Sequence, residues 1–194
     1  MARKGISKDI IIEEAIQLIE QSGKPEISMR ALAEHLRVRT PSLYNHVRSM
    51  DELLACVSSR AAGQLKEALL AAMASKRSDE AVYALANAYR GFAKEHKGLY
   101  QIIMASSGLT GSDGHPAAGA MIDPVMEALA GYSLTREQVM HWQRVLRSIM
   151  HGFVSEEEAG FFRRYNVDVD LSYTRAVYAF LCGVKAESGE TNHA

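Results

Sequence analysis

The chain has 194 residues, of which 47% are hydrophobic and 23% are charged, and its formal net charge at pH 7 is -1. This length and composition predict one large domain, or a small and a medium one, around a sizeable core, and they argue against a disordered chain. The net charge argues against a surface coated with nucleic acid, although residues 1–50 carry eight Lys and Arg against six Asp and Glu. Only the amino-terminal part of the chain therefore leans basic.

From the amino terminus onward the local signals are helical, and strand signals are nearly absent. Serine and threonine recur at positions that suit helix caps. The predicted helices begin near Ser7, Ser28, Thr40, Ser49, Ser78, Gly98, Ala117, Thr135 and Asp168. The glycine-containing segment from Ser106 to Pro116 is the predicted long loop. We therefore expect an all-α protein of about nine helices.

Three of these helix starts carry specific signals. Thr40 followed by Pro41 predicts an N-cap and a first helical residue, because proline has no amide to lose there. Ser49 is followed three residues later by glutamate, which predicts a capping box at the fourth helix. Thr135 and Gln138 predict a second capping box.

The stretch "RALAEHLRVRTPSLYNHVRS", residues 30–49, has the pattern of a helix-turn-helix, whose second helix can lie in the DNA major groove. Its apolar residues Leu32, Leu36, Val38, Leu43 and Val47 are expected to face inward. Short hydrogen-bonding side chains can approach base edges, and a tyrosine hydroxyl can reach a phosphate. The polar residues left outside are Arg39, Thr40, Ser42, Tyr44, Asn45, His46 and Arg48. A small three-helix bundle that only packs on the rest of the chain is the alternative.

"LAEHLRVRTPSLYNHVRSMDELL", residues 32–54, resembles the amino-terminal signature of the tetracycline-repressor (TetR) family. "WQRVLRSIMHGFVSEEEAGFF", residues 142–162, resembles a subtype of the family's ligand domain that carries a His-Gly motif (WHG type). The resemblance implies that Thr40, Pro41 and Ser42 face base edges. It also implies that Arg30 reaches a base or a phosphate, that Tyr44 and His46 hold phosphates, and that Asn45 reads either.

The chain departs from the family pattern at two positions. Arg37 stands where the turn usually has glycine, so either it adopts a left-handed conformation or the turn differs. Met50 stands where the family commonly has a lysine that touches phosphate, and Arg48 is the candidate replacement.

A homodimer is expected, because one helix-turn-helix offers few contacts and two half-sites about 34–36 Å apart double them. The last two long helices carry apolar stripes with an a/d-like spacing, and family members dimerise through the corresponding helices. The predicted interface comprises Val145, Ile149, Phe153, Tyr173, Val177, Phe180, Leu181 and Val184. The alternative is that these stripes pack only within one chain.

The middle helices are expected to form a compliant apolar effector pocket, because the chain has nine methionines and their side chains repack easily. The predicted lining comprises Tyr89, Phe92, Tyr100, Met104, Met121, Val125, Trp142 and Leu146. An ordinary helical core is the alternative for any one of them. Asn87 and Arg90 are candidates to orient a polar group of the effector.

The sequence thus predicts a cytoplasmic, homodimeric repressor of transcription, with a DNA-binding domain at residues 1–50 and an effector and dimerisation domain at residues 51–194. A small apolar effector is expected to release it from a palindromic operator. No phosphate loop, nucleophile elbow or paired metal-ligand motif is found, so we expect no enzyme, no cofactor, no metal and no membrane partner. Two alternatives remain: a small-molecule-binding protein whose DNA-binding domain is vestigial, and an enzyme whose active site lies in a cavity of the middle helices.

Overall fold

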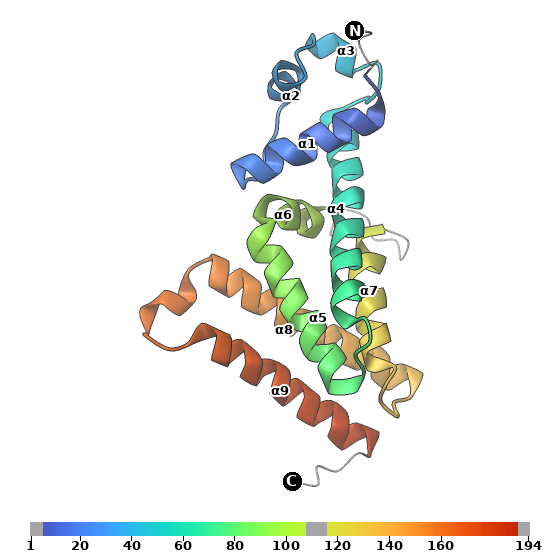
Figure 1. Ribbon diagram of the computed structural model, residues 1–194, viewed down its shortest axis with the longest axis vertical. Helices are drawn as coiled ribbons and strands as arrows, with labels where there is room; N and C mark the ends of the chain where they lie inside the picture. Colours follow the sequence, from blue (N-terminus) through green and yellow to red (C-terminus); the bar gives the residue numbers. More distant parts are fainter. Residues whose placement is uncertain (1–5, 108–115, 190–194) are drawn as a thin grey trace. The chain divides into compact units, whose positions relative to one another are not determined.

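The structure is a computed structural model, and it describes residues 6–107 and 116–189 (Figure 1). Every regular element within those residues is helical, which confirms the all-α prediction. The elements are α1 (Lys8–Ser22), α2 (Met29–His35), α3 (Thr40–Leu43), α4 (Met50–Met73), α5 (Ser78–Glu95), α6 (Lys97–Ser107), α7 (Pro116–Leu129), α8 (Arg136–Glu158), the 3-10 helix η1 (Phe161–Arg164) and α9 (Val169–Ser188). The predicted loop at residues 106–116 lies mostly outside the described residues.

Capping side chains begin several helices where the sequence predicts them. The hydroxyls of Ser7 and Ser28 each accept a hydrogen bond from the amide three residues further on, at the starts of α1 and α2. Thr135 and Gln138 form both bonds of the predicted capping box at α8. Each bond satisfies an amide that has no partner inside its helix, so these caps fix where the elements begin.

Helix α3 begins one residue earlier than predicted. Its N-cap is Arg39, which has an extended backbone and makes no side-chain capping bond, so Thr40 is the first helical residue rather than the cap. Pro41 is tolerated at the next position because that amide also lacks an acceptor within the helix. The helix is only four residues long, and the chain continues in turns to His46.

Two compact units divide the chain, and each is described by itself. The first contains the described residues within 1–64 and 95–118, and the second those within 65–94 and 119–194. In the first unit α1 packs against α2 and α6, and α2 packs against α3. Its core contains Ile11, Ala15, Ile19, Leu32, Leu43, Val47, Leu53 and Val57, each at most 1% exposed. This core holds the predicted helix-turn-helix in place.

In the second unit α8 lies beside α9, and η1, which the sequence analysis did not predict, follows α8 (Figure 1). One stripe of α9 is buried within this unit, and the Tyr173 hydroxyl donates a 2.7 Å hydrogen bond to the carbonyl oxygen of Ala86 on α5. The stripe comprises Tyr173, Val177, Phe180, Leu181 and Val184, each at most 3% exposed. No helix among the described residues is long and apolar enough to cross a membrane.

Candidate functional site

The turn between α2 and α3 is closed by backbone hydrogen bonds that place Arg37 in a left-handed conformation. The Val38 amide donates to the Ala33 carbonyl at 2.9 Å, and the Arg37 amide donates to the Glu34 carbonyl at 3.1 Å. These two bonds form a Schellman motif, whose left-handed residue is usually glycine. Arg37 occupies that position with φ +55. It therefore adopts the left-handed conformation, which was one of the two expectations for this residue. The family-type turn is therefore kept without its glycine, at the cost of local strain.

Leu43 and Val47 fix the orientation of the segment proposed to read DNA, residues 39–48, which we call the reading segment. Both are buried, at 0% and 1% exposure. Since they stand four residues apart in a helical and turn backbone, the residues between them point outward. Tyr44 is 51% exposed, and Asn45 and His46 are also exposed. Three polar side chains are thus presented from one short rigid segment.

The other residues predicted to contact DNA lie in or near this segment in the same unit. Arg39, Pro41 and Arg48 are exposed, whereas Thr40 and Ser42 are half-buried. Arg30, at the start of α2, is exposed and its Nε donates a 2.9 Å hydrogen bond to Glu34. That hydrogen bond raises the pKa of Arg30. All nine residues belong to the first unit.

Glu52 is a residue of this site that the sequence analysis gave only a capping role. Its amide donates to the Ser49 hydroxyl at 3.1 Å, which is half of the predicted capping box. Its carboxylate instead accepts a 2.7 Å bond from the Arg48 amide and a 2.6 Å bond from Lys8 of α1. The Lys8 bond, followed by the Arg48 bond, lowers the pKa of Glu52. Glu52 therefore ties α1, the end of the reading segment and α4 together.

Most of the residues predicted to line the effector pocket are buried, and they are divided between the two units. Tyr89, Phe92, Met121, Val125 and Leu146 are buried in the second unit, and Tyr100 is buried in the first. Met104, in the first unit, and Trp142, in the second, are half-buried.

Trp142 lies between α8 and α9. Its ring is 5.4 Å from that of Phe180, edge to face, and its indole N–H donates to Glu187 at 2.6 Å. A Cβ atom at Gly183 would come within 2.5 Å of the Trp142 ring, so only glycine allows this close packing. Trp142 therefore packs against α9 in this structure.

Gln143 is a buried polar residue that the sequence analysis did not name. It is 2% exposed, and its amide group donates a 3.2 Å bond to the Met140 carbonyl. Its Oε1 has no hydrogen-bond partner among the residues that the structure describes. The signal in the sequence is its spacing to Leu146 and Met150, which places all three on the inner face of α8. A buried acceptor without a partner is a candidate contact for a polar group of a ligand.

Arg90 joins three helices of the second unit instead of facing an open pocket. Its guanidinium forms two 2.8 Å bonds to Glu157 on α8 and a 2.8 Å contact to Asp170 on α9. It also lies 5.4 Å from the centre of the Phe153 ring and 5.0 Å from that of Tyr173. The bonds to Glu157 and Asp170 raise the pKa of Arg90 despite its burial. The suggested effector contact is thus occupied by partners within the chain, and Asn87 is exposed.

The residues predicted for the dimer interface divide by burial. The five on α9 are buried within their own unit, so they pack inside one chain, as the alternative interpretation of this stripe has it. On α8, Val145 is 41% exposed, and Ile149 and Phe153 are half-buried. The outer side of α9 instead exposes Leu171 at 47% and Tyr178 at 57%. Exposed apolar side chains therefore occur on both helices, and on α9 they lie away from the predicted stripe, among exposed polar residues such as Thr174 and Arg175.

Among the residues that the structure describes, no three His, Cys, Asp or Glu side chains are grouped so that they could hold a metal ion. The two cysteines, Cys56 and Cys182, are free thiols and half-buried.

Comparison with known proteins assigns both parts of the chain. Residues 11–57 match the family described as bacterial regulatory proteins, tetR family, and residues 82–180 match the family described as tetracyclin repressor-like, C-terminal domain. A relative from Mycobacterium tuberculosis, an uncharacterised HTH-type transcriptional regulator, is 31% identical over 182 residues, which cover 93% of this chain and 82% of the relative. These matches are to regulators of transcription, not to enzymes.

Two solved structures share the fold. The Streptomyces coelicolor TetR family protein ActR in complex with actinorhodin has a TM-score of 0.69 and 19% identity, with 95% of this chain and 99% of that chain covered. A TetR variant from Acinetobacter baumannii in complex with minocycline has a TM-score of 0.68 and 18% identity, with 93% and 97% covered. At these identities the likeness concerns the fold.

Proposed function

The chain belongs to the tetR family of transcriptional regulators, and from that premise we propose that it is a cytoplasmic repressor released from DNA by a small apolar effector. Two chains occupy a palindromic operator and block transcription. Residues 1–50 read the DNA, and residues 51–194 bind the effector and form the dimer. The function therefore needs three surfaces: a reading segment, an effector pocket and a dimer interface.

The observation that carries this proposal is the arrangement around Leu43 and Val47. Because both side chains are buried in the first unit, Tyr44, Asn45 and His46 are held outward on a fixed backbone. This run of hydrogen-bonding side chains lies between two exposed arginines, Arg39 and Arg48. Arginine and tyrosine supply phosphate contacts, and serine, threonine and asparagine supply contacts to base edges.

The proposed dimer interface uses the outer sides of α8 and α9. Val145 on α8 and Leu171 and Tyr178 on α9 are large side chains left between 41% and 57% exposed. A second copy of the chain covers them without disturbing the buried stripe of α9. Dimerisation then places two reading segments on one face of the duplex, at half-sites about one helical turn apart.

Effector release follows from the apolar interior of the second unit. Tyr89, Phe92, Met121, Val125 and Leu146 supply apolar surface, and Gln143 Oε1 supplies one acceptor for orientation. Two structures with this fold are named as complexes with actinorhodin and with minocycline, which supports a small-molecule effector here. Binding that moves α4 changes the separation of the two reading segments. A coupling of about 1–3 kcal/mol is enough for such a switch.

The experiment that tests this function is selection of bound fragments from a random duplex DNA pool, followed by affinity measurements at several salt concentrations. We expect a palindromic sequence to be enriched, and we expect the affinity for it to fall steeply as the salt concentration rises. Each neutralised phosphate contributes about -0.9 to the slope of log affinity against log salt concentration. If no sequence is enriched at any salt concentration, the reading segment does not read DNA. The alternative of a small-molecule-binding protein with a vestigial DNA head would then replace this proposal.

Two substitutions separate base reading from phosphate binding on the selected operator. Ser42→Ala is expected to relax the preference at one base pair and to cost about 1–3 kcal/mol there. Tyr44→Phe removes only a hydroxyl and is expected to weaken binding to all sequences alike. Competition binding against operators with single substitutions measures both effects. The reverse pattern would show that the two roles are exchanged.

A further inference from the structure

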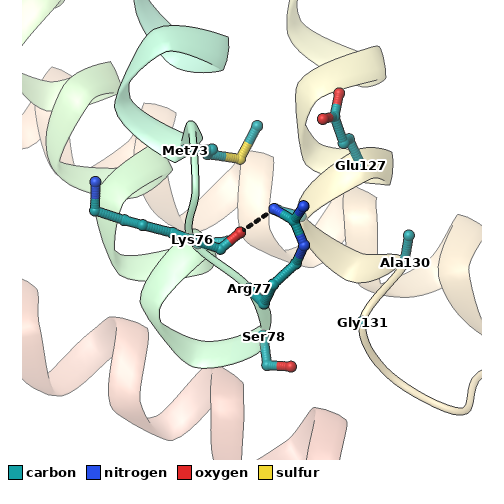
Figure 2. Close-up of a pocket in the computed structure, with 9 residues that line it drawn as sticks. Met73, Lys76, Arg77, Ser78, Glu127, Ala130 and Gly131 are labelled. Carbon is teal, nitrogen blue, oxygen red and sulfur yellow. Dashed lines mark hydrogen bonds between the residues drawn. The ribbon is translucent and has the colours of Figure 1, made fainter.

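A cavity of the second unit lies at the turn between α4 and α5, against the end of α7 (Figure 2). Its volume is about 260 Å³, below the roughly 300–1,000 Å³ of pockets for drug-sized ligands. It shares no residue with the effector pocket proposed above. Its lining comprises Met73, Lys76, Arg77, Ser78, Ala81, Glu127, Ala128, Ala130 and Gly131. The volume of the cavity limits any ligand bound there to a small molecule.

Two opposite charges line this cavity, and neither has a charged partner among the residues that the structure describes. Arg77 rises from the turn toward Met73 and α7, and Glu127 stands on α7 (Figure 2). One nitrogen of Arg77 donates a 2.7 Å bond to the Lys76 carbonyl, which holds the guanidinium near the turn and leaves its other N–H groups available. Within residues 6–107 and 116–189, no Asp or Glu oxygen lies within 4.0 Å of an Arg77 nitrogen, and no Lys, Arg or His nitrogen lies within 4.0 Å of a Glu127 oxygen.

The third charge of the lining, Lys76, is already used. Its ammonium donates a 2.8 Å bond to the Ala72 carbonyl at the end of α4. This bond caps a carbonyl that the helix leaves free, and it is favourable at a helix carboxyl end. The cavity therefore offers one cation and one anion, rather than a basic patch.

The backbone around the cavity is held in an unusual form. Ser75 and Ser78, which flank Lys76 and Arg77, have φ values of +67 and +48, a region that residues with a side chain rarely adopt. A Cβ atom at Gly131 would come within 2.9 Å of the Ser78 hydroxyl, so glycine allows the end of α7 to approach the turn. Strained residues that cluster beside a cavity are a reason to look for a binding role there.

We propose that this cavity binds a small zwitterion with an apolar body, of the α-amino acid type. The ligand carboxylate pairs with the Arg77 guanidinium, whose planar donors suit a carboxylate. Its ammonium pairs with the Glu127 carboxylate, and its side chain lies on Met73, Ala81 and Ala128, which are 5%, 4% and 2% exposed. A simple anion meets repulsion from Glu127, and a simple cation meets repulsion from Arg77. The pair of charges thus selects against ligands that carry only one of them.

The test is calorimetric titration of the full-length protein with L-leucine and L-methionine. The matched probes are 4-methylpentanoate, which lacks the ammonium of leucine, and 3-methylbutylamine, which lacks its carboxylate. We expect at least one of the two amino acids to bind once per chain, with each single-charge probe at least tenfold weaker than leucine or undetectable. Absence of saturable binding by both amino acids up to about 10 mM would overturn the proposal.

Three variants tie the binding to the named charges. Arg77→Gln and Glu127→Gln are each expected to weaken amino acid binding at least tenfold, whereas Arg144→Gln, on α8 and outside the cavity lining, leaves it unchanged. All three side chains are exposed, so equal thermal unfolding temperatures are expected and serve as the folding control. Equal affinity of wild type, Arg77→Gln and Glu127→Gln would overturn the assignment. Since no DNA is present, a failure here is distinguishable from a failure of the repressor proposal.

Discussion

The reading segment of the first unit and helix α9 of the second unit both carry apolar residues at helical spacing, and they use them differently. In the reading segment only two apolar side chains, Leu43 and Val47, are buried, and the polar side chains between them are exposed. In α9 five apolar residues fill the inner stripe, and further apolar residues such as Leu171 and Tyr178 remain on the outer side. We infer that the polar outer side of the reading segment contacts DNA, and that the exposed apolar side chains of α9 are covered by another chain.

The largest effect is expected where the second unit depends on a buried charge. Arg90→Ala removes two of the three side-chain hydrogen bonds that Glu157 accepts and leaves the one from Lys94. We expect it to lower the free energy of unfolding by about 3 kcal/mol, at the lower end for buried pairs because Lys94 still pairs with Glu157 and Asp170 is exposed. Urea unfolding measures this change. Arg175→Ala, an exposed arginine on α9, is the control and should change the free energy by less than about 0.5 kcal/mol. Similar small effects for both would show that the Arg90 cluster is not stabilising.

The outer side of α9 is tested next. Tyr178→Glu places a charge on the proposed dimer interface, and we expect the dissociation constant of the dimer to rise at least tenfold, or about 1.4 kcal/mol, without loss of helical content. Sedimentation velocity over a range of concentrations measures the change. Asn87→Glu, on the exposed side of α5, should leave the dimer unchanged. A dimer that tolerates Tyr178→Glu would place the interface elsewhere.

A smaller effect is expected at the turn that precedes the reading segment. Arg37→Gly removes the backbone strain of a left-handed residue that has a side chain. It should stabilise the protein by about 1 kcal/mol, after the greater flexibility of glycine in the unfolded chain is subtracted. Thermal unfolding should show a rise of about 2–4 °C. Arg39→Gly, at φ -84, is the matched control and should lower the unfolding temperature. A fall for both variants would mean that the Arg37 side chain stabilises the turn.

The smallest effect concerns pH. The pKa of Glu52 is held below its ordinary value of 4.5 by Lys8 and the Arg48 amide, so its ionised form stabilises the first unit at neutral pH. This contribution is lost as pH falls through the lowered pKa. The unfolding temperature of Glu52→Gln should therefore lie below that of wild type at pH 7, and the difference should shrink below about pH 4.5. Glu26→Gln, at an exposed residue of the same unit, is the control. A difference in unfolding temperature between wild type and Glu52→Gln that stays constant at all pH values would contradict the account.

The helices of the first unit could be predicted well because their signals are local. Ser7 and Ser28 cap helices through bonds to amides three residues away, as Thr135 does in the second unit, and these bonds need no knowledge of the fold. Arg39, not Thr40, is the cap of α3, and it directly follows the turn that the Arg37 and Val38 amides close onto carbonyls of α2. Such a shift by one residue is beyond what a capping pattern can resolve.

The second unit was harder to predict because its decisive facts are tertiary. A stripe of apolar residues on α9 does not say whether the chain's own core or a second copy covers it, and burial of Tyr173 and Val177 shows its own core does. The partners of Arg90 lie 67 and 80 positions away in the chain, at Glu157 and Asp170. Arg77 and Glu127, the charges that line the cavity at the turn between α4 and α5, likewise come from separate parts of the chain, so no local pattern marks them.

The measurement that tests the central claim most directly is the affinity of the full-length chain for its selected operator when five base pairs are inserted between the half-sites. The insertion turns one half-site by about half a helical turn, since the helical repeat is about 10–10.5 base pairs. A homodimer with two fixed reading segments predicts a loss of affinity of at least about 100-fold, or roughly 2.7 kcal/mol. Unchanged affinity would show that each chain reads DNA alone, and it would contradict the proposed repressor.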